Sequence, residues 1–319
     1  MYIIGAGYTG LIAGVLFPQA TILEAAPQAN LNHTALLRFR TPTIGDVTHI
    51  PFQKVPVMKT IWCYGTERSP SPRYSNLYSK KVTGELIARS IQNIDHCERY
   101  IAPDDLYQKL LDLCWDRIRW NSTISYVDSN IIVAGPEAEF NRSKMPVVST
   151  IPLKYICRAT STQTAAHFSH KHIHTYRVKL KTPSFCFYTV YYPHPNFPAY
   201  RASITRDILI IETLAGAELE LGHLIEICNS LGIGLEDLDG DPHKELYGVE
   251  KLEQKYGKIA PINEKERQRL VYELTVKHNI FTLGRFGTWR NILLDDVYGD
   301  ILKIKRLINL TPYEIKLEF

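Results

Sequence analysis

The first ten residues constrain the fold of this chain more than any other segment. Residues 5–10 read Gly-Ala-Gly-Tyr-Thr-Gly and follow directly on a short apolar start. In such a turn Gly5 allows a tight exit from a strand, Gly7 a close approach of a pyrophosphate, and Gly10 close packing of a helix on the strand. The pattern therefore predicts a strand, a phosphate-binding turn and a helix.

The residues after this turn complete a compact β-α-β unit. Thr9–Phe17 predicts a short helix, and Ala20–Leu23 predicts a second strand that ends at Glu24. The free N–H groups at the start of the helix would face the phosphates. Glu24 follows Gly5 by 19 residues, a distance at which a carboxylate can accept the hydroxyls of an adenosine ribose. The unit predicts dinucleotide binding, but it fits NAD and FAD equally well.

Composition places the chain among ordinary globular proteins. Its 319 residues are 45% hydrophobic, and no apolar run is long enough to cross a bilayer. We find no leader sequence, so a cytoplasmic location is expected. The six cysteines form no CxxC pair, and the histidines at 167, 170, 172 and 174 lack nearby Cys or acidic ligands. We therefore expect no metal site and no membrane partner.

Charge is unevenly distributed along the sequence. From Phe140 to Arg206 there is no Asp or Glu, whereas basic residues are frequent. A positive field of this kind concentrates an anionic small molecule or a nucleic-acid-linked substrate. The expected substrate contacts are Arg177, Lys179 and Tyr200.

The remaining elements follow from apolar periodicity and turn residues. Extended segments are expected at Ala35–Arg40 and Val55–Trp62. Strands are expected at Arg117–Trp120, Ile124–Val127, Asn130–Ala134, Pro146–Ile151, His174–Thr182, Phe185–Tyr192, Ile208–Thr213 and Asn279–Leu283. Helices are expected at Thr83–Ile94, from Pro103 onward, and at Leu219–Leu231, Glu264–Lys277 and Asp296–Leu307.

Three downstream segments carry a resemblance to a known group. Met145–Leu153 resembles the strand and turn that precede the substrate domain in flavin amine oxidases, protoporphyrinogen oxidases and UDP-galactopyranose mutases. Leu283–Asn291, followed by Leu294–Val297, resembles the second flavin motif of the mutase-like branch, and Pro198–Ile204 resembles one of its substrate-domain strands. The resemblance favours FAD over NAD.

This resemblance implies an α/β fold with a discontinuous, Rossmann-like FAD-binding domain and an inserted, mixed-sheet α+β substrate domain. The first would comprise residues 1–35, 75–155 and 260–319, and the second residues 36–74 and 156–259. The Gly-Gly-Arg loop usual in amine oxidases is missing, and Arg38 could do the work of its arginine. The implied FAD contacts are Gly5, Ala6, Gly7, Tyr8, Thr9, Gly10, Glu24, Ala25, Arg38, Ile124, Thr150, Gly284, Arg285, Asp296 and Val297.

The resulting expectation is an FAD-dependent, amine-oxidase-like oxidoreductase that oxidises a C–N bond of an anionic, nucleotide-like or nucleic-acid-linked substrate. Arg201 and His33 are the candidate catalytic residues. One alternative is a flavin-dependent nucleotide-sugar mutase resembling UDP-galactopyranose mutase. Another is a non-enzymatic binding protein resembling the Rab GDP-dissociation inhibitors. The oligomeric state is not predicted.

Overall fold

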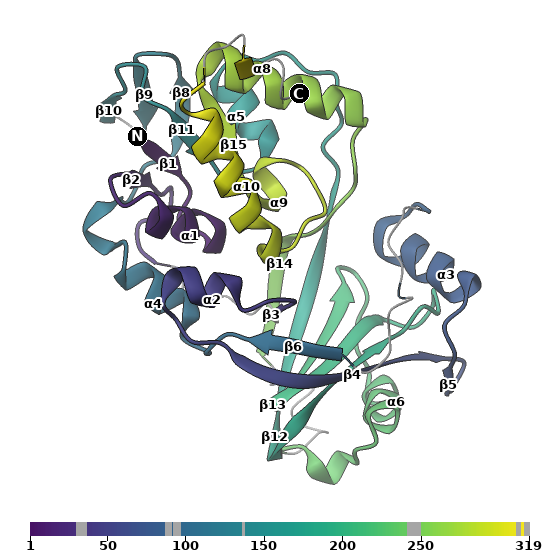
Figure 1. Ribbon diagram of the computed structural model, residues 1–319. Coiled ribbons are helices and arrows are strands. Elements are labelled where there is room, and N and C mark those ends of the chain that lie inside the picture. Colours follow the sequence, from purple (N-terminus) through teal and green to yellow (C-terminus); the bar gives the residue numbers. More distant parts are fainter. Residues whose placement is uncertain are drawn as a thin grey trace.

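The computed structural model describes residues 1–29, 37–86, 91, 97–135, 138–240, 250–310 and 314–315. Within them the chain is a mixed α/β protein built around two large sheets, one above the other in Figure 1. The upper sheet has the strand order β15-β11-β1-β2-β7, and its pairings are all parallel. Its strands are β1 (Tyr2–Ile4), β2 (Thr21–Leu23), β7 (Ile118–Arg119), β11 (Val147–Ser149) and β15 (Ile280–Thr282).

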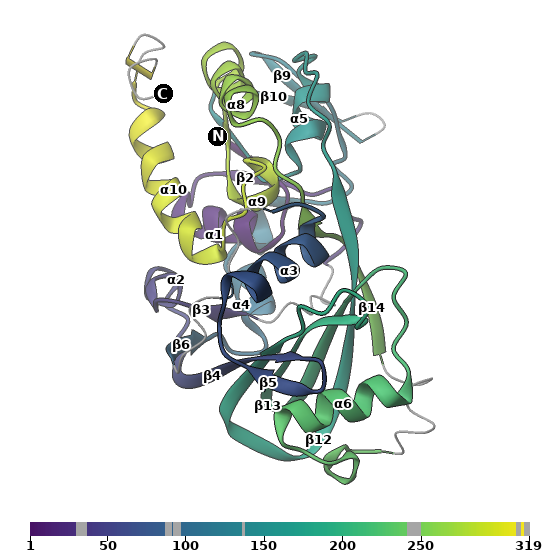
Figure 2. The ribbon, with the colours of Figure 1, turned by 90° about the vertical axis from the view of Figure 1, so that its right-hand side faces the viewer.

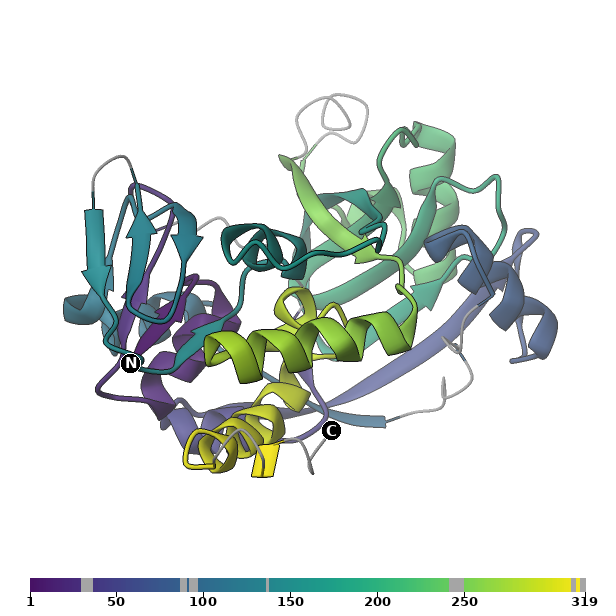
Figure 3. The same ribbon diagram turned by 90° about the horizontal axis from the view of Figure 1, so that it is seen from above.

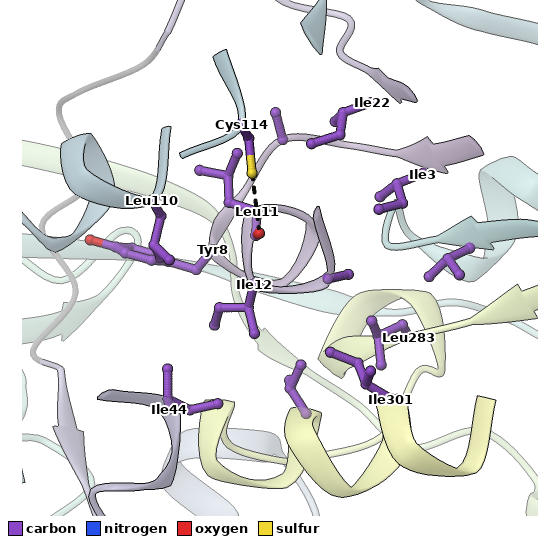
Figure 4. Packing of buried hydrophobic residues seen from close by; sticks show 14 of the residues in the cluster. Ile3, Tyr8, Leu11, Ile12, Ile22, Ile44, Leu110, Cys114, Leu283 and Ile301 are labelled. Atoms are coloured by element: carbon purple, nitrogen blue, oxygen red, sulfur yellow. Dashed lines mark hydrogen bonds between the residues drawn. The ribbon is translucent and has the colours of Figure 1, made fainter. Parts of the chain in front are cut away.

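Helices cover both faces of the parallel sheet, because alternate residues of its short strands face opposite sides. Ile3 enters a core that it shares with α1 (Tyr8–Leu16), α2 (Thr43–Thr48), α4 (Leu106–Asp112) and α10 (Leu294–Leu307), which Figure 4 shows at close range. Its neighbour Ile4 enters a second core with α5 (Leu153–Ala159) and α8 (Glu264–His278). The predicted β-α-β start is confirmed.

A small antiparallel sheet lies beside α5. It consists of β8 (Ile124–Val127), β9 (Ile131–Ala134) and β10 (Ala138–Asn141) and is seen apart from the larger sheets in Figure 3. Val127 and Ile132 pack into the core that contains α5 and α8. The predicted strands at Ile124–Val127 and Asn130–Ala134 are thereby confirmed.

The lower sheet is mixed and strongly curved. Its order is β13-β12-β4-β6-β3, with β14 also paired to β12 and β5 to β4. In Figure 2, α6 (Leu221–Leu231) lies against this sheet, and α3 (Pro72–Thr83) lies above it. The strands are β3 (Arg38–Phe39), β4 (Gln53–Cys63), β5 (Thr66–Arg68), β6 (Cys97–Ile101), β12 (His170–Tyr191), β13 (Ala199–Leu214) and β14 (Glu250–Ile259).

The two longest strands were each predicted as a pair of shorter strands. β12 instead runs for 22 residues and β13 for 16, with shifts in their register between Lys179 and Tyr188. Arg206 has a positive φ of 55° where β13 passes this irregularity. Such bulges bend a strand while leaving it paired. The bend brings Arg201 and Glu212, near opposite ends of β13, into an ion pair.

The helix expected at Thr83–Ile94 is absent at the described positions 84–86 and 91, and residues 87–90 and 92–94 of that range lie outside the described residues; the helix in this region is α3. α3 begins after Ser71, whose hydroxyl accepts from the N–H of Tyr74, and it ends at Gly84, which has a φ of 86°. Tyr78 and Val82 of α3 pack with the lower sheet. α3 therefore packs on the lower sheet and β6 is one of its strands, although the predicted range 75–155 assigned both to the dinucleotide-binding part.

Among the described residues, no helix combines the length and the apolar character needed to cross a bilayer.

Candidate functional site

Each glycine of the Gly-Ala-Gly-Tyr-Thr-Gly turn meets a different steric demand. Gly5 has a φ of 98°, and a Cβ at Gly10 would lie 1.8 Å from the carbonyl oxygen of Gly5. Around Gly7, by contrast, an added Cβ would meet no atom within 4 Å. Gly7 is exposed and caps the N-terminus of α1 without a side-chain partner. The protein itself therefore needs Gly5 and Gly10, while the open face of Gly7 suits an external group.

Hydrogen bonds to Glu24 link this turn to the end of β2. Its two carboxylate oxygens accept the N–H of Ala6 at 2.6 Å and the N–H of Ala26 at 2.9 Å. Each oxygen keeps a second lone pair for a hydroxyl. The carboxylate thus lies next to the glycine turn, as the sequence predicted.

Two segments that are distant in sequence converge on this turn. A Cβ at Gly5 would lie 2.6 Å from Oγ1 of Thr150, which donates to the carbonyl of Ile4 at 2.8 Å. A Cβ at Gly284 would lie 2.7 Å from Cγ2 of Thr9. A Cβ at Gly287 would lie 2.6 Å from the carbonyl oxygen of Ser149. The glycine turn, the β11 turn and the β15 turn therefore pack directly on one another.

These contacts test whether the residues fit an adenine dinucleotide. Helix α1 begins after Gly7 without a side-chain cap and without an acidic residue in its first turn, and the Glu24 carboxylate lies beside this turn. An N-terminus without negative charge favours a phosphate. The described residues fit the dinucleotide that the sequence predicts.

Asp296 lies in the first turn of α10, which follows the short helix α9 (Gly284–Gly287) in the chain. It accepts the N–H of Leu293 at 2.9 Å and pairs with Arg40 at 2.5 Å. Asp295 accepts the N–H of Arg40 at 2.7 Å. Burial raises the pKa of Asp296, but the Leu293 N–H and Arg40 outweigh it, so the pKa lies below its usual range. This carboxylate is ionised at neutral pH and links α10 to the strand that enters the lower sheet.

The other predicted cofactor residues are placed less centrally. Ala25 is exposed next to Glu24, and Ile124 is half-buried in the small sheet. The Arg285 Nε donates to the carbonyl of Ile292 at 3.1 Å. Val297 is buried in the core behind α10, and the ring of Tyr8 packs edge-on against Tyr107.

Arg38 lies away from the glycine turn. Its guanidinium crosses to β12 and β13, where it donates to Oγ1 of Thr189 at 2.6 Å, to the carbonyl of Ile204 at 2.8 Å and to Oγ1 of Thr205 at 2.8 Å. Burial and the neighbouring Arg201 lower the pKa of Arg38 to about 10. No described contact directs this side chain to the dinucleotide turn.

Arg201 and Tyr200 lie inside the curved sheet. Arg201 forms a bidentate pair with Glu212, in which its Nη2 donates to Oε1 at 2.8 Å. Burial opposes ionisation of Glu212, but Arg201 outweighs it, and the pKa of the carboxyl lies below its ordinary value. Tyr200 is fully buried beside Tyr78. The charge of Arg201 is therefore already balanced by a protein group.

Side chains of the span from Phe140 to Arg206, which contains no Asp or Glu, pair with acidic residues from other parts of the chain. Lys179 lies 3.6 Å from Asp239, His172 lies 2.5 Å from Glu253, and Arg206 lies 2.7 Å from Asp104. Arg177, in contrast, has no ion-pair or hydrogen-bond partner among the described residues. The positive field predicted from sequence is reduced wherever these pairs form.

A half-buried lysine and a buried lysine were not anticipated. The ammonium of Lys81 donates to the carbonyls of Tyr192, His194 and Ala199 at 2.7 to 2.8 Å, and burial lowers the pKa of Lys81 to about 7. Lys258, near the end of β14, is 6% exposed and lies 4.5 Å from the ring centre of Tyr200. Neither position differs in sequence from an ordinary surface lysine.

His33 lies outside the described residues. Among the residues that are described, no group of three His, Cys, Asp or Glu side chains could hold a metal ion.

Comparison with known proteins gives a match in structure but not in sequence. No family model and no curated protein matches the chain. A fatty acid isomerase from P. acnes aligns with a TM-score of 0.60 at 14% identity, over 96% of this chain and 97% of that one. An engineered putrescine oxidase aligns at 0.59 and 10% identity, over 97% and 98%. An oxidoreductase from Methanosarcina mazei aligns at 0.55 and 10% identity, over 96% and 99%.

The chain shares its fold with solved structures described as an oxidase, an oxidoreductase and a monooxygenase. A p-nitrophenol 4-monooxygenase from Pseudomonas putida aligns at a TM-score of 0.51 and 10% identity, over 96% of this chain and 78% of that one. The resemblance to the flavin amine oxidase group, inferred from sequence segments, is thus confirmed at the level of the fold.

Proposed function

We propose that this chain binds FAD and acts as an oxidoreductase. In this proposal the parallel-sheet part is a Rossmann-like FAD-binding domain, and the curved sheet with α3 and α6 is the substrate-binding domain. The convergence of Gly5, Thr150 and Gly284 carries the proposal, since it joins the dinucleotide-binding turn to two of the segments that resemble flavoprotein motifs. The fold shared with oxidoreductases and oxygenases supports it.

The chain's own residues take distinct roles toward the cofactor. Gly7 and the N-terminus of α1 would hold the pyrophosphate, and Glu24 would accept the ribose hydroxyls. Asp296, kept ionised, would accept a ribityl hydroxyl, and the positive end of α10 would favour negative charge near it. When bound, FAD supplies the two-electron redox chemistry. These assignments explain why Gly7 has an open face while its two neighbouring glycines do not.

For the reaction, we propose oxidation at a C–N bond, in keeping with the resemblance to amine oxidases. Putrescine oxidase shares the fold. We place Arg201 among the groups that shape the substrate-binding face, held in one orientation by Glu212. The anionic, nucleotide-like or nucleic-acid-linked substrate stays a proposal, supported by the guanidinium of Arg177, which has no ion-pair partner among the described residues. Lys179 supports it less, because Asp239 balances its charge.

The test is a visible spectrum of the purified chain, followed by anaerobic reduction trials with amines, nucleotides and nucleic acid that carries modified bases. A yellow protein that is reduced by one of these classes is the expected result. Peroxide release during aerobic turnover would exclude the nucleotide-sugar mutase, which consumes no oxidant. A chain that stays colourless after incubation with FAD would refute the proposal and favour a binding protein of the GDP-dissociation-inhibitor type.

A further inference from the structure

Strand β3 belongs to both halves of the molecule. Phe39 is 2% exposed and enters the core around α1, whereas Arg38 points to the opposite side and reaches the curved sheet. The next residue, Arg40, bonds Asp295 and Asp296 at the start of α10. Arg38 therefore lies against the face of β12 and β13 that is opposite to the face packed on α6.

The charge of Arg38 is not balanced by the described residues. Its partners are two hydroxyls and backbone carbonyls, and no described carboxylate bonds it. Glu212, a carboxylate of the same sheet, is taken by Arg201 in a bidentate pair. A buried charge that lacks an opposite charge is costly unless a ligand or partner supplies one.

Two buried donors on this face also lack partners. The Nε of Arg38 is buried and has no hydrogen-bond partner in the described part of the chain, and the same holds for Oγ1 of Thr175. Thr175 lies opposite Glu212 in the β12–β13 pairing. Buried polar atoms in folded proteins are nearly always paired, so unpaired donors on a polar face indicate a missing acceptor. The hydroxyls of Thr189 and Ser203, 3.0 Å apart, extend the same polar face.

We propose that Arg38 is the receptor for an anionic group, a carboxylate or a phosphate, on the molecule that binds this sheet face. The inference rests on the proposed function in taking the curved sheet as the substrate-binding part. It assigns the contact with the anionic group to Arg38 and not to Arg201, because Glu212 already balances the charge of Arg201. Charge-assisted hydrogen bonds to a guanidinium are short and strong, and the low local dielectric strengthens them further.

The experiment uses the full chain, saturated with FAD so that phosphate cannot occupy the glycine turn. Benzoate, phenyl phosphate and the uncharged benzyl alcohol are titrated while the arginine Nε–H resonances are followed by NMR. The Arg38 resonance is assigned by its loss in Arg38→Lys. Saturable movement of this resonance with benzoate or phenyl phosphate is expected, and the tighter of the two identifies the anionic group. No movement, or equal movement with benzyl alcohol, would overturn the proposal.

Calorimetric titration of variants gives a second measure. Arg38→Met should weaken binding of the preferred anion at least about tenfold. Lys54→Gln, which removes an exposed cation of the same sheet paired with Glu98, should leave binding within about twofold. Equal losses in both variants would contradict a specific receptor. If Arg38→Met does not fold, the wild-type NMR titration decides alone.

The two proposals fail in distinguishable ways. A sample that stays colourless with FAD, but whose Arg38 resonance responds to benzoate, would refute the flavoprotein assignment and leave the receptor in place. A yellow sample whose Arg38 resonance is unresponsive would do the reverse.

Discussion

Substitution of Gly7 by alanine separates cofactor binding from folding. The φ of Gly7 is −71°, which alanine adopts without strain, and a Cβ there would meet no protein atom within 4 Å. Alanine is a poorer N-cap than glycine by up to about 1 kcal/mol. Alanine also lowers the conformational entropy of the unfolded chain, which stabilises the folded state by roughly 0.4–1 kcal/mol and offsets that cost. The free energy of unfolding without FAD should therefore change by less than about 1 kcal/mol.

The same methyl group would occupy the open face on which we place the pyrophosphate. Displacing the phosphate from one backbone N–H removes a charge-assisted hydrogen bond, which is worth about 1.5–3 kcal/mol. That range corresponds to a loss in FAD affinity of about 10- to 100-fold. The assay is an equilibrium titration that follows quenching of FAD fluorescence, paired with urea unfolding of the apo chain.

Gly222→Ala is the matched control. Gly222 lies in the first turn of α6, and a Cβ there also meets nothing within 4 Å. This variant should bind FAD as the wild type does and be more stable by up to about 1 kcal/mol. Wild-type FAD affinity in a folded Gly7→Ala chain would refute our placement of the pyrophosphate.

Three further predictions concern stability. Gly10→Ala should cost at least about 2 kcal/mol in urea unfolding, because its Cβ would collide with the Gly5 carbonyl; an unchanged curve would contradict this packing. Arg201→Met should cost about 3 kcal/mol by leaving Glu212 buried without its partner, and adding Glu212→Gln should recover part of that loss, whereas additive losses would contradict the coupling. Since the folded pKa of Glu212 is depressed, its contribution is complete above the ordinary value of 4.5 and is lost as pH falls through the folded pKa. The stability difference between wild type and Glu212→Gln should shrink over that range, and a constant difference would argue against an ionised, paired Glu212.

The part of the site that is local in sequence was predictable. The glycine turn, the following helix and Glu24 are fixed by backbone sterics within a few residues, and the structure places them together. The signals for α3 were also present, as Ser71 and Pro72 at its start and Gly84 at its end. No helix was predicted at Pro72–Thr83 from these residues.

The curved sheet could not be predicted in the same way. Pro183 indicates a strand end in sequence, but it lies at the register shift that lets β12 continue. The ion pairs of Lys179 and Arg206 join residues far apart in the chain, so a count of charges along a segment misses them. The role of Arg38 likewise depends on how the sheet bends, which no local pattern encodes.

The visible absorption spectrum of the purified chain, before and after incubation with FAD and removal of excess cofactor, tests the central claim most directly. Our account predicts a flavin spectrum with an equimolar ratio of FAD to protein, and a much weaker spectrum for Gly7→Ala under the same conditions. A folded chain that retains no FAD would contradict it.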